Sequence, residues 1–539
     1  MMSTVAIKSK VEISKRLVFI NSASSLVTRL LSISVLIWLQ QYLLKRITAE
    51  EYSLLPVLYS VMMFAPLITT ILTGGLGRYI VEAYAKDDDK RVTQIVSTMF
   101  PILCAAGFVF LAGGWTLAWY IGSVLNIAPE RLWDARIMMA MLMFSAAVRL
   151  PLAPFGVGLY VRQKFVLQNL IGVGTEIFRL TLLFTLVLGV STRVLWVVTA
   201  AVTADLLNLA ITQAISRRLV PSLRFNLPSR NWSVAREITG FGGWSFVSSL
   251  GETIRTGADP IVLNKLATAH DVTCFYVGGM VQRELQGILG TMLAPFSPAL
   301  TAIYATGDMA RLRAVFLRGG RIAMLGGLLI VLPLIVFRRP LIELYVGSRY
   351  MAASVVMALL LGQSLFYWGN ILFSPIAYAS GRIRALSAVS TGMNFVNLML
   401  TFYLVGYLRM GAVGSALATF CASTALWSLF ISPMAIRFLG IRVSQCWHEA
   451  WLPGGLPSLI SVPVWILLQE TIYPSTWLML GLEWLLGCVV YVIAAASLSL
   501  KQADWRDMRH LASSARGFLG QRRERVASTV GCSALTRRS

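Results

Sequence analysis

Long apolar runs recur along most of the chain. Runs such as 100–124 and 194–215 each hold the roughly 20 apolar residues that a helix needs to cross a hydrocarbon layer about 30 Å thick. The runs are continuous and rich in Leu, Ala, Gly and Met, whereas barrel strands alternate polar and apolar positions. The pattern therefore predicts an all-α polytopic membrane protein with about 14 transmembrane helices.

The boundaries of these helices follow the edges of the apolar runs. We expect helices at 17–43, 52–75, 95–122, 134–159, 165–190, 194–216, 239–263, 274–303, 314–337, 351–379, 384–407, 411–437, 453–473 and 476–499. The longest polar connection, 217–237, contains Pro221 and Pro228 and separates six helices from the next six. This division predicts an N-terminal lobe at 1–220, a cytoplasmic linker at 221–238, a C-terminal lobe at 239–440, helices 13 and 14 at 441–500, and a basic cytoplasmic tail at 501–539.

A short motif repeats at an offset of about 220 residues, at equivalent places in the two six-helix blocks. Its first copy is Tyr84-Ala85 with Asp88 and Arg91, and its second is Tyr304-Ala305 with Asp308 and Arg311. A weaker match near the same offset pairs Tyr160 with Tyr378. Such spacing favours two parallel repeats related by an axis along the membrane normal, which is one known layout of secondary transporters.

The charge pattern explains the basic composition. The chain carries 47 Lys and Arg against 24 Asp and Glu, which would suit a nucleic-acid-binding protein. However, about 32 of the basic residues fall on one side of the predicted spans and about 10 on the other, as the positive-inside rule describes. We therefore expect both termini in the cytoplasm, a multi-pass membrane location, and no nucleic-acid partner.

Catalytic and metal-binding motifs are missing from the sequence. The cysteines have no paired spacing, the three histidines are scattered, and no Gly-rich phosphate loop with its lysine is present. The loops are also too short to hold the catalytic carboxylates of a membrane glycosyltransferase. We expect neither an enzyme nor a resident cofactor or metal.

Polar residues inside the spans mark the candidate pathway, because ionisable groups there cost about 2.5–3.5 kcal/mol each and tend to face a cavity. In the first predicted helix, Asn21, Ser25 and Arg29 share one face. In the seventh, the stripe includes Ser249, Glu252, Arg255 and Asp259. We expect these two faces to meet across a water-filled cavity.

Four further charged positions extend this set. They are Arg149, next to two prolines that bend the fourth helix, Glu176 in the fifth, Asp205 in the sixth, and Arg283 in the eighth. Glu176 lies three residues before Arg179, so these two side chains can also simply pair within their helix.

The residue types suggest two roles. Arginine suits a phosphate through its fixed fork of donors, so Arg29, Arg149, Arg255 and Arg283 are candidate contacts for an anionic cargo, together with Asn21, Ser25 and Ser249. A carboxylate in a partly dry cavity can bind a proton or a sodium ion. Glu176, Asp205, Glu252 and Asp259 are therefore candidates for H⁺ or Na⁺ coupling.

Several segments resemble a known family. The turn from Gly74 to Arg78, the stretch from Tyr378 to Arg384, and the stretch from Gly411 to Ala416 are similar to the polysaccharide transporters, the Wzx-type O-antigen flippases of the multidrug and oligosaccharidyl-lipid exporter superfamily. The resemblance implies two six-helix lobes around a V-shaped cavity, as in the MATE transporters and the lipid II flippases. It also implies alternating-access export of a polyprenyl-pyrophosphate-linked oligosaccharide across the bacterial inner membrane, for surface polysaccharide such as O-antigen.

The same resemblance suggests partners and specific arginines. Its implied partners are membrane lipids and the polymerase and glycosyltransferases of the same pathway. Helices 13 and 14 are also similar to those of the lipid II flippases, whose first, second and eighth helices carry cavity arginines. Arg29 and Arg283 would be the equivalents here, while no basic residue between Glu51 and Gly77 matches the second.

Two other functions remain open at this point. An ion-coupled efflux antiporter for cationic drugs would have an aromatic and acidic cavity. A membrane glycosyl-transfer enzyme would turn over a sugar donor by itself.

Overall fold

The computed structural model describes residues 37–73, 76–162, 164–293, 300, 303–304, 306–380, 383–500 and 504. Within this part of the chain the structure is helical and contains no strand, as the sequence predicts. Most of the predicted first helix, including Asn21, Ser25 and Arg29, and almost all of the basic tail lie outside the described residues.

The first group of helices runs from α2 to α10. Its members are α2 Ala49–Met62, α3 Ala65–Thr73, α4 Leu76–Ala85, α5 Asp89–Trp119, α6 Ile121–Val124, α7 Leu132–Leu152, α8 Gly158–Val161, α9 Phe165–Gly189 and α10 Val194–Leu219, with 3-10 turns at Pro129–Arg131 (η1) and Ala153–Val157 (η2). A 3-10 turn at Leu227–Ser229 (η3) then leads to α11 Trp232–Leu266.

The second group consists of α11 and the elements that follow it, from α12 to α24. Its other α-helices are α12 Ala269–Gly278, α13 Met280–Leu293, α15 Met309–Val336, α16 Arg338–Val346, α17 Ala352–Gly362, α18 Phe373–Ala379, α19 Ile383–Thr401, α20 Gly411–Ala425, α21 Ser432–Leu439, α22 Val443–Cys446, α23 Leu452–Thr471 and α24 Trp477–Leu498. Short 3-10 segments lie at Ser348–Tyr350 (η4), Gln363–Phe366 (η5) and Trp368–Asn370 (η6), and π-helical turns at Phe402–Tyr407 (η7), Leu426–Ile431 (η8) and Trp447–Trp451 (η9).

Eleven helical segments of the described chain are long and apolar enough to cross a membrane. The other three predicted spans are the first, most of which is not described, and the seventh and eighth. The seventh predicted span corresponds to α11, and the eighth corresponds to α12 and α13. Their polar residues make these helices less apolar than the eleven segments. The chain is thus a multi-pass membrane protein of the predicted all-α class, and the count of fourteen stays a prediction.

Breaks in the helices occur at matching places in the two groups. The second predicted helix is interrupted at Met63–Phe64 and the eighth at Gly279. The fourth, bent as expected beside Pro151 and Pro154, turns 3-10 at Ala153–Val157, and the tenth does so between Gln363 and Asn370. These pairs keep nearly the spacing of the sequence repeat, which supports two repeats of one fold.

The repeated motif forms the same turn twice. Asp88 Oδ1 accepts a hydrogen bond from the Arg91 backbone N–H at 2.9 Å and caps α5, and Asp308 Oδ1 accepts one from Arg311 at 2.9 Å and caps α15. The residue before each cap is left-handed, with φ of 56° at Asp87 and 72° at Gly307. Both copies of the sequence repeat therefore form the same capping turn.

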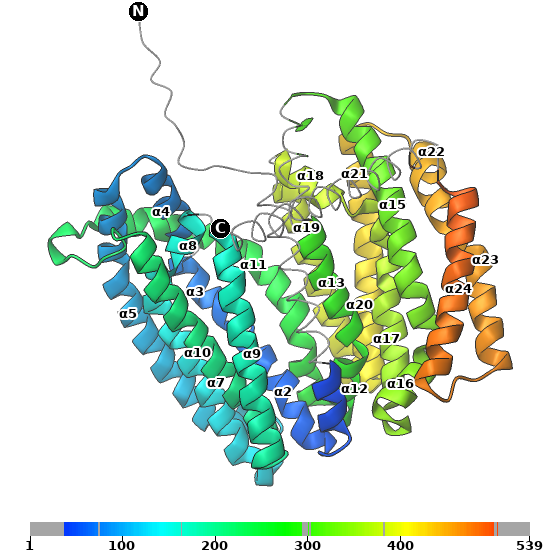
Figure 1. The fold of residues 1–539 in the computed structure, drawn as a ribbon, viewed down its shortest axis with the longest axis horizontal. Helices are drawn as coiled ribbons and strands as arrows, with labels where there is room; N and C mark the ends of the chain where they lie inside the picture. Colours follow the sequence, from blue (N-terminus) through cyan, green and yellow to red (C-terminus); the bar gives the residue numbers. More distant parts are fainter. Residues whose placement is uncertain are drawn as a thin grey trace, which may run out of the picture.

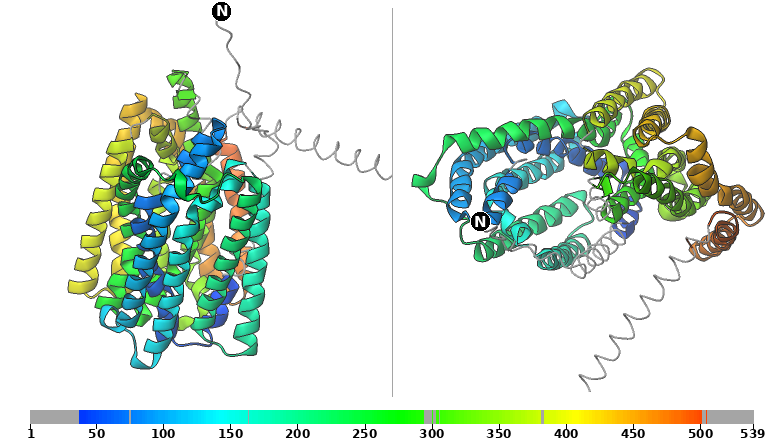
Figure 2. Two further views of the ribbon diagram at one scale, coloured as in Figure 1. Left: turned by 90° about the vertical axis from the view of Figure 1, so that its left-hand side faces the viewer. Right: turned by 90° about the horizontal axis from the view of Figure 1, so that it is seen from above.

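Helix α11 packs against both groups. Near its start, Val234 and Ile238 are buried in a core with Val92 of α5, whereas further along it packs on α2, α3 and α19. Seen from above, it reaches from the edge of the first group to the middle of the molecule (Figure 2). The helix begins at Trp232, seven residues before its predicted start, because its polar first turns lie on a protein core and not in the apolar run.

The buried cores define a V shape. One core joins both groups and includes Leu54 of α2, Val272 of α12 and Ile342 of α16. Away from this end the cores are separate, one around Ile95 and Leu223 in the first group and another in the second group. Accordingly, the two groups approach each other at the bottom of Figure 1 and diverge toward the top. We call the joined side the closed end and the other the open end.

Candidate functional site

A cavity of about 420 Å³ lies in the second group of helices. Its wall combines side chains from α11, α13, the η5–η6 break, α19, and α20 with η8. The polar and aromatic lining residues are Arg255, Gln282, Gln286, Gln363, Ser364, Tyr367, Trp368, Ser390, Asn394, Asn397, Ser423 and Trp427. The broken tenth span thus supplies four of its polar or aromatic groups, which agrees with irregular backbone being tolerated at membrane depth where it lines a cavity.

Among the described residues that line the cavity, Arg255 is the only one with a charged side chain. It is half-buried and comes from the middle of α11, in the stripe that the sequence singled out. The remaining polar groups are amides and hydroxyls, which both donate and accept hydrogen bonds. The cavity therefore combines one fixed positive charge with a wall that suits neutral polar groups.

Asp259 lies one helical turn beyond Arg255 and is buried behind the cavity wall. Its carboxylate oxygens accept hydrogen bonds from the Thr401 hydroxyl at 3.1 Å and the Thr419 hydroxyl at 3.3 Å. The same Thr419 hydroxyl also lies 3.4 Å from Oδ1 of Asn397, which lines the cavity. Asp259 interacts electrostatically with Arg255, so it can influence the cavity without facing it.

Close contact between α11 and α19 fixes this wall. The Asn394 side-chain amide donates to the Gly251 carbonyl at 2.9 Å, and a Cβ at Gly251 would come within 2.5 Å of the Thr391 hydroxyl. Only glycine allows this approach without a shift of the neighbouring helix. Ser249 lies half-buried on the same helix, whereas the Glu252 side chain is outside the described ones.

Charged side chains of the first group form mutual pairs. The Arg149 guanidinium of α7 pairs with the Asp205 carboxylate of α10, which also accepts from the Ser145 hydroxyl at 2.6 Å. Arg149 is 59% exposed and Asp205 36% exposed, so this pair faces open space. On α9, Arg179 Nε donates to Glu176 at 2.9 Å, which is the local pairing that their spacing allows.

Arg283 lies away from the cavity lining. Its guanidinium stands over the Tyr276 ring at 4.2 Å and donates to the Tyr276 carbonyl at 2.5 Å, while Gln282 and Gln286 of the same helix face the cavity. Tyr276 itself packs edge-on against Tyr52 of the first group. Arg283 thus belongs to the boundary between the groups, next to the closed end.

The closed end is held by polar contacts as well as by its core. Asn126, in the loop after α6, donates from its backbone N–H to Asn264 Oδ1 at 2.8 Å, and the Asn264 amide donates to the Asn126 carbonyl at 3.0 Å. The Tyr345 hydroxyl of α16 donates to the Ile37 carbonyl at 2.7 Å. These bonds connect segments far apart in the sequence and can only form when this end is shut.

Sequence reasoning found Arg255 but missed the amides. Asn394 and Asn397 are three apart on α19, and Gln282 and Gln286 four apart on α13, so each pair shares a helix face within an apolar span. That spacing was a usable signal, because unsatisfied amides are costly in lipid. In the part of the chain that is described, no group of His, Cys, Asp and Glu could hold a metal ion.

Comparisons with known proteins add a family and a fold. A family model described as "Polysaccharide biosynthesis protein" matches residues 14–303. The uncharacterized membrane protein EpsK of Bacillus subtilis (strain 168) is 20% identical over 405 residues, covering 74% of this chain and 79% of that protein.

Solved structures resemble most of the helical arrangement. The lipid II flippase MurJ in an inward closed conformation superposes with a TM-score of 0.66 at 14% identity, covering 91% of this chain and 99% of that chain. An inward-facing multidrug resistance MATE family transporter of the MOP superfamily gives 0.58 at 15% identity, covering 77% and 98%. A MOP superfamily transporter from Pyrococcus furiosus gives 0.56 at 13% identity, covering 83% and 99%. These likenesses confirm the predicted fold class.

Proposed function

The chain belongs to the polysaccharide biosynthesis protein family, and from this premise we propose that it is a flippase for a lipid-linked oligosaccharide. Its cargo is a polyprenyl-pyrophosphate-linked oligosaccharide, which it moves from the cytoplasmic to the outer face of the bacterial inner membrane. Membrane lipids surround it, and the glycosyltransferases and polymerase of the same pathway supply and consume the cargo.

The composition of the cavity wall carries this proposal. An arginine among amides, hydroxyls and aromatic rings suits a ligand with an anionic group and many neutral hydroxyls. Arg255 is assigned to the pyrophosphate or to an acidic sugar, through charge-assisted hydrogen bonds. Ser249 of the same helix and Asn21, Ser25 and Arg29 of the first helix are assigned to the same pathway.

The aromatic side chains suit the sugar rings. Tyr367 and Trp427 both line the cavity and meet edge to face, with their ring centroids 4.7 Å apart. Flat aromatic faces contact apolar ligand surfaces, while the neighbouring amides bond to hydroxyls. The pair therefore supports recognition of a sugar whose two faces differ in polarity.

The basic connections orient the molecule. Lys90, Arg91 and Arg224 lie at the open end, beside the core of the first group, and among the described residues the closed end carries fewer basic side chains than the open end. By the positive-inside rule, the open end faces the cytoplasm, where lipid-linked sugars are made. This conformation would then be ready to load its cargo.

Coupling to an ion gradient is assigned first to Asp259, which is buried beside Arg255, and next to Glu252, Asp205 and Glu176. Because Asp205 and Glu176 already pair with arginines, they are weaker candidates for binding H⁺ or Na⁺. A buried carboxylate held by two threonines can exchange a proton when the cavity hydrates.

A flipping assay tests the proposal. The full-length protein is reconstituted in liposomes with a polyprenyl-pyrophosphate oligosaccharide, and a membrane-impermeant lectin reports the sugar that reaches the other face. We expect protein-dependent exposure that falls in Arg255→Gln. Lys265→Gln, which removes a positive charge at the exposed end of the same helix, is the matched control. In cells, a double variant carrying Arg29→Ala and Arg255→Ala that still supports the wild-type amount of surface polysaccharide would exclude the arginine assignment.

The same liposomes separate the alternatives. Uptake of a cationic dye with no exposure of the oligosaccharide would favour a drug antiporter, although the positive lining residue argues against cationic cargo. Turnover of a sugar donor would indicate a glycosyl-transfer enzyme.

A further inference from the structure

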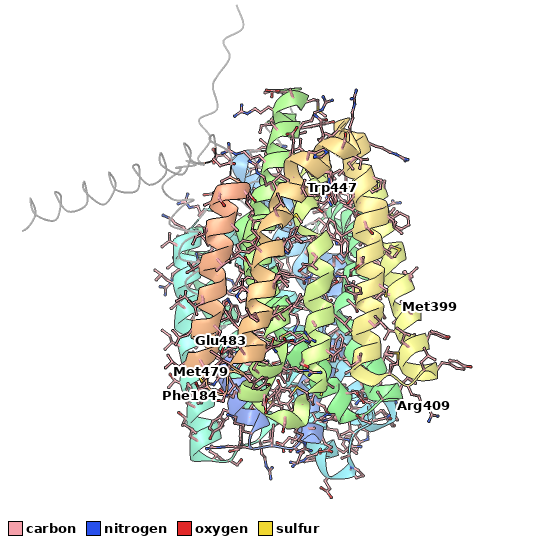
Figure 3. The ribbon with its side chains drawn as sticks, turned by 90° about the vertical axis from the view of Figure 1, so that its right-hand side faces the viewer. Phe184, Met399, Arg409, Trp447, Met479 and Glu483 are labelled. Atoms are coloured by element: carbon pink, nitrogen blue, oxygen red, sulfur yellow. The ribbon has the colours of Figure 1, made fainter. Side chains whose placement is uncertain are left out.

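Helices α23 and α24 lie at the outer edge of the second group, away from the first group (Figure 1). Helix α24 nevertheless buries a carboxyl group. Glu483 is 5% exposed, and Figure 3 labels it on the half of α24 that lies toward the closed end, near Met479. This acid takes no part in the cavity or in the proposed coupling.

The surroundings of Glu483 are apolar. It belongs to the buried stripe of α24 that includes Leu480, Gly487 and Tyr491, at heptad-like spacing. A Cβ at Gly487 would come within 1.9 Å of the Trp465 ring, so α23 and α24 meet tightly beside Glu483. Leu480, Trp465 and Tyr491 share one core with side chains of α15 and α16.

Neither carboxyl oxygen of Glu483 has a hydrogen-bond partner among the described residues. The surrounding elements carry further ionisable groups. They are Arg311, Arg313, Arg318 and Arg321 of α15, Arg338, Arg339, Glu343 and Tyr345 of α16, Glu470 of α23, Tyr473 of the following loop, and Cys488 and Tyr491 of α24. Of these, Glu343 accepts from the Tyr473 hydroxyl at 2.8 Å, and the Tyr491 hydroxyl donates to the Leu325 carbonyl at 3.0 Å. None of them forms an ion pair or hydrogen bond with Glu483 in the described structure.

The other buried acids of the described chain behave differently. Glu51 pairs with Arg131 at 2.8 Å and accepts from the Val194 backbone N–H at 3.1 Å. Asp504 pairs with two arginines of α15, and Asp259 accepts from two threonines. A carboxylate without such partners is costly in an apolar interior, so the neutral acid is the form that this packing accommodates.

We propose that Glu483 is a proton-binding site within the membrane, occupied in this conformation and linked to the closed end through α16. The link is visible in the packing. Leu341 and Leu344 of α16 contact the core around Glu483, while Ile342 and Tyr345 of the same helix lie in the core that joins the two groups. A movement of α16 that opens the closed end must change the packing around Glu483, and the proton can then leave.

This inference rests on the proposed movement of the two groups, but not on the cargo. Both experiments below contain no lipid-linked oligosaccharide, so a wrong cargo would not affect them. Conversely, a negative result for the proton site at Glu483 would not change what the liposome flipping assay shows about the cargo.

Carbodiimide modification tests the bound proton. Dicyclohexylcarbodiimide reacts with protonated carboxyl groups in apolar surroundings, and mass spectrometry of the full-length protein in liposomes locates the adduct. We expect an adduct on Glu483 at neutral pH that decreases severalfold at alkaline pH, and none on the exposed Glu470 of the adjoining helix. No adduct on Glu483, or one that does not change with pH, would overturn the site.

Thiol labelling tests the link. Cys274 is fully buried in the core of the closed end, and it can serve as the reporter once the other five of the six cysteines are replaced. At alkaline pH, Glu483 of the parent loses its proton, whereas the side chain in Glu483→Gln stays neutral. We therefore expect a maleimide to label Cys274 severalfold more slowly in Glu483→Gln than in the parent. The control Glu470→Gln should be labelled at the rate of the parent. Equal labelling in Glu483→Gln and the parent would refute the link. If Glu483→Gln does not fold, the modification of the unaltered protein still decides the proton site.

Discussion

The two groups of helices hold their intramembrane charges differently. In the first, Arg149 pairs with Asp205 and Arg179 with Glu176, so positive and negative side chains neutralise each other. In the second, Arg255 lines a cavity whose other described polar residues are neutral, and Asp259, which interacts electrostatically with Arg255, lies behind the wall, bonded to threonines. The two groups thus share a fold but differ in how their charged side chains are partnered.

The difference suggests a division of labour. A neutral pair offers an anionic ligand little net attraction, because the carboxylate cancels the arginine. Arg255 lies in the wall of the second group's cavity, where its guanidinium suits a pyrophosphate. We infer that the second group binds the charged part of the cargo and that the first group mainly provides the opposing wall.

The largest expected effect comes from preventing the two groups from separating. Asn126→Cys with Asn264→Cys, in a background without native cysteines, places two thiols where the closed end is bridged by hydrogen bonds. Joining them with a short bifunctional thiol reagent should reduce flipping to the level of empty liposomes, because the cargo cannot leave on that side. Each single variant, treated with the same reagent, should keep its activity. Undiminished flipping in the cross-linked protein would show that the groups do not move apart here.

The next largest effect separates the two arginines. Arg255→Gln removes charge-assisted hydrogen bonds worth about 1.5–3 kcal/mol, so apparent affinity for the lipid-linked sugar should fall about 10- to 100-fold. Arg149→Gln should cost less, and adding Asp205→Asn should restore most of that loss, because the pair is then removed as a whole. Titration of the cargo in the liposome assay measures both. A larger loss in Arg149→Gln than in Arg255→Gln would reverse the proposed division.

A smaller effect is expected at the buried acids. Asp259→Asn keeps the shape of the side chain but removes its charge, so flipping driven by an imposed proton or sodium gradient should fall severalfold, whereas exchange without a gradient should persist. Asp205→Asn is the matched control in the first group and should leave the gradient dependence in place. Gradient dependence that survives Asp259→Asn but not Asp205→Asn would move the coupling site to the first group.

Much of the fold could be predicted from hydropathy, because a bilayer requires continuous apolar helices. The predicted starts at 165, 194 and 411 agree with the structure, but hydropathy misses a helix start that lies outside the lipid. Helix α5 begins at Asp89 and α15 at Met309, each several residues before the apolar run, with its Asp cap in the aqueous region. The repeated motif was visible in the sequence, but only the backbone conformation in the structure shows that each copy forms a capping turn.

The candidate site was predictable only in part. Charge in a span draws attention to Arg255, yet it equally marked Arg149 and Glu176. Only the structure distinguishes them, because it places Arg255 in the cavity wall. The neutral amides of α13 and α19 carry little hydropathy signal individually. Glu483 went unnoticed because a single acid in helix 14 looks like one more interruption until the burial of both its oxygens is known.

The smallest expected effect tests what the two groups still share. At one position of the two capping turns, Asp87 occupies the left-handed conformation that Gly307 occupies in the second copy. Asp87→Gly should therefore stabilise the protein by at most about 1 kcal/mol, and Gly307→Ala should destabilise it by about 1 kcal/mol. A Cβ at Gly307 meets no atom within 4 Å, so the cost is one of backbone conformation and not of space.

Gly326→Ala, equally unobstructed but inside α15, should be neutral or stabilising and serves as the control. Thermal unfolding in detergent, with shifts of at most a few degrees, is the measurement. Shifts of the same sign in Asp87→Gly and Gly307→Ala would mean that the two turns are not equivalent, and the repeat would then be a likeness of sequence without a common structural role.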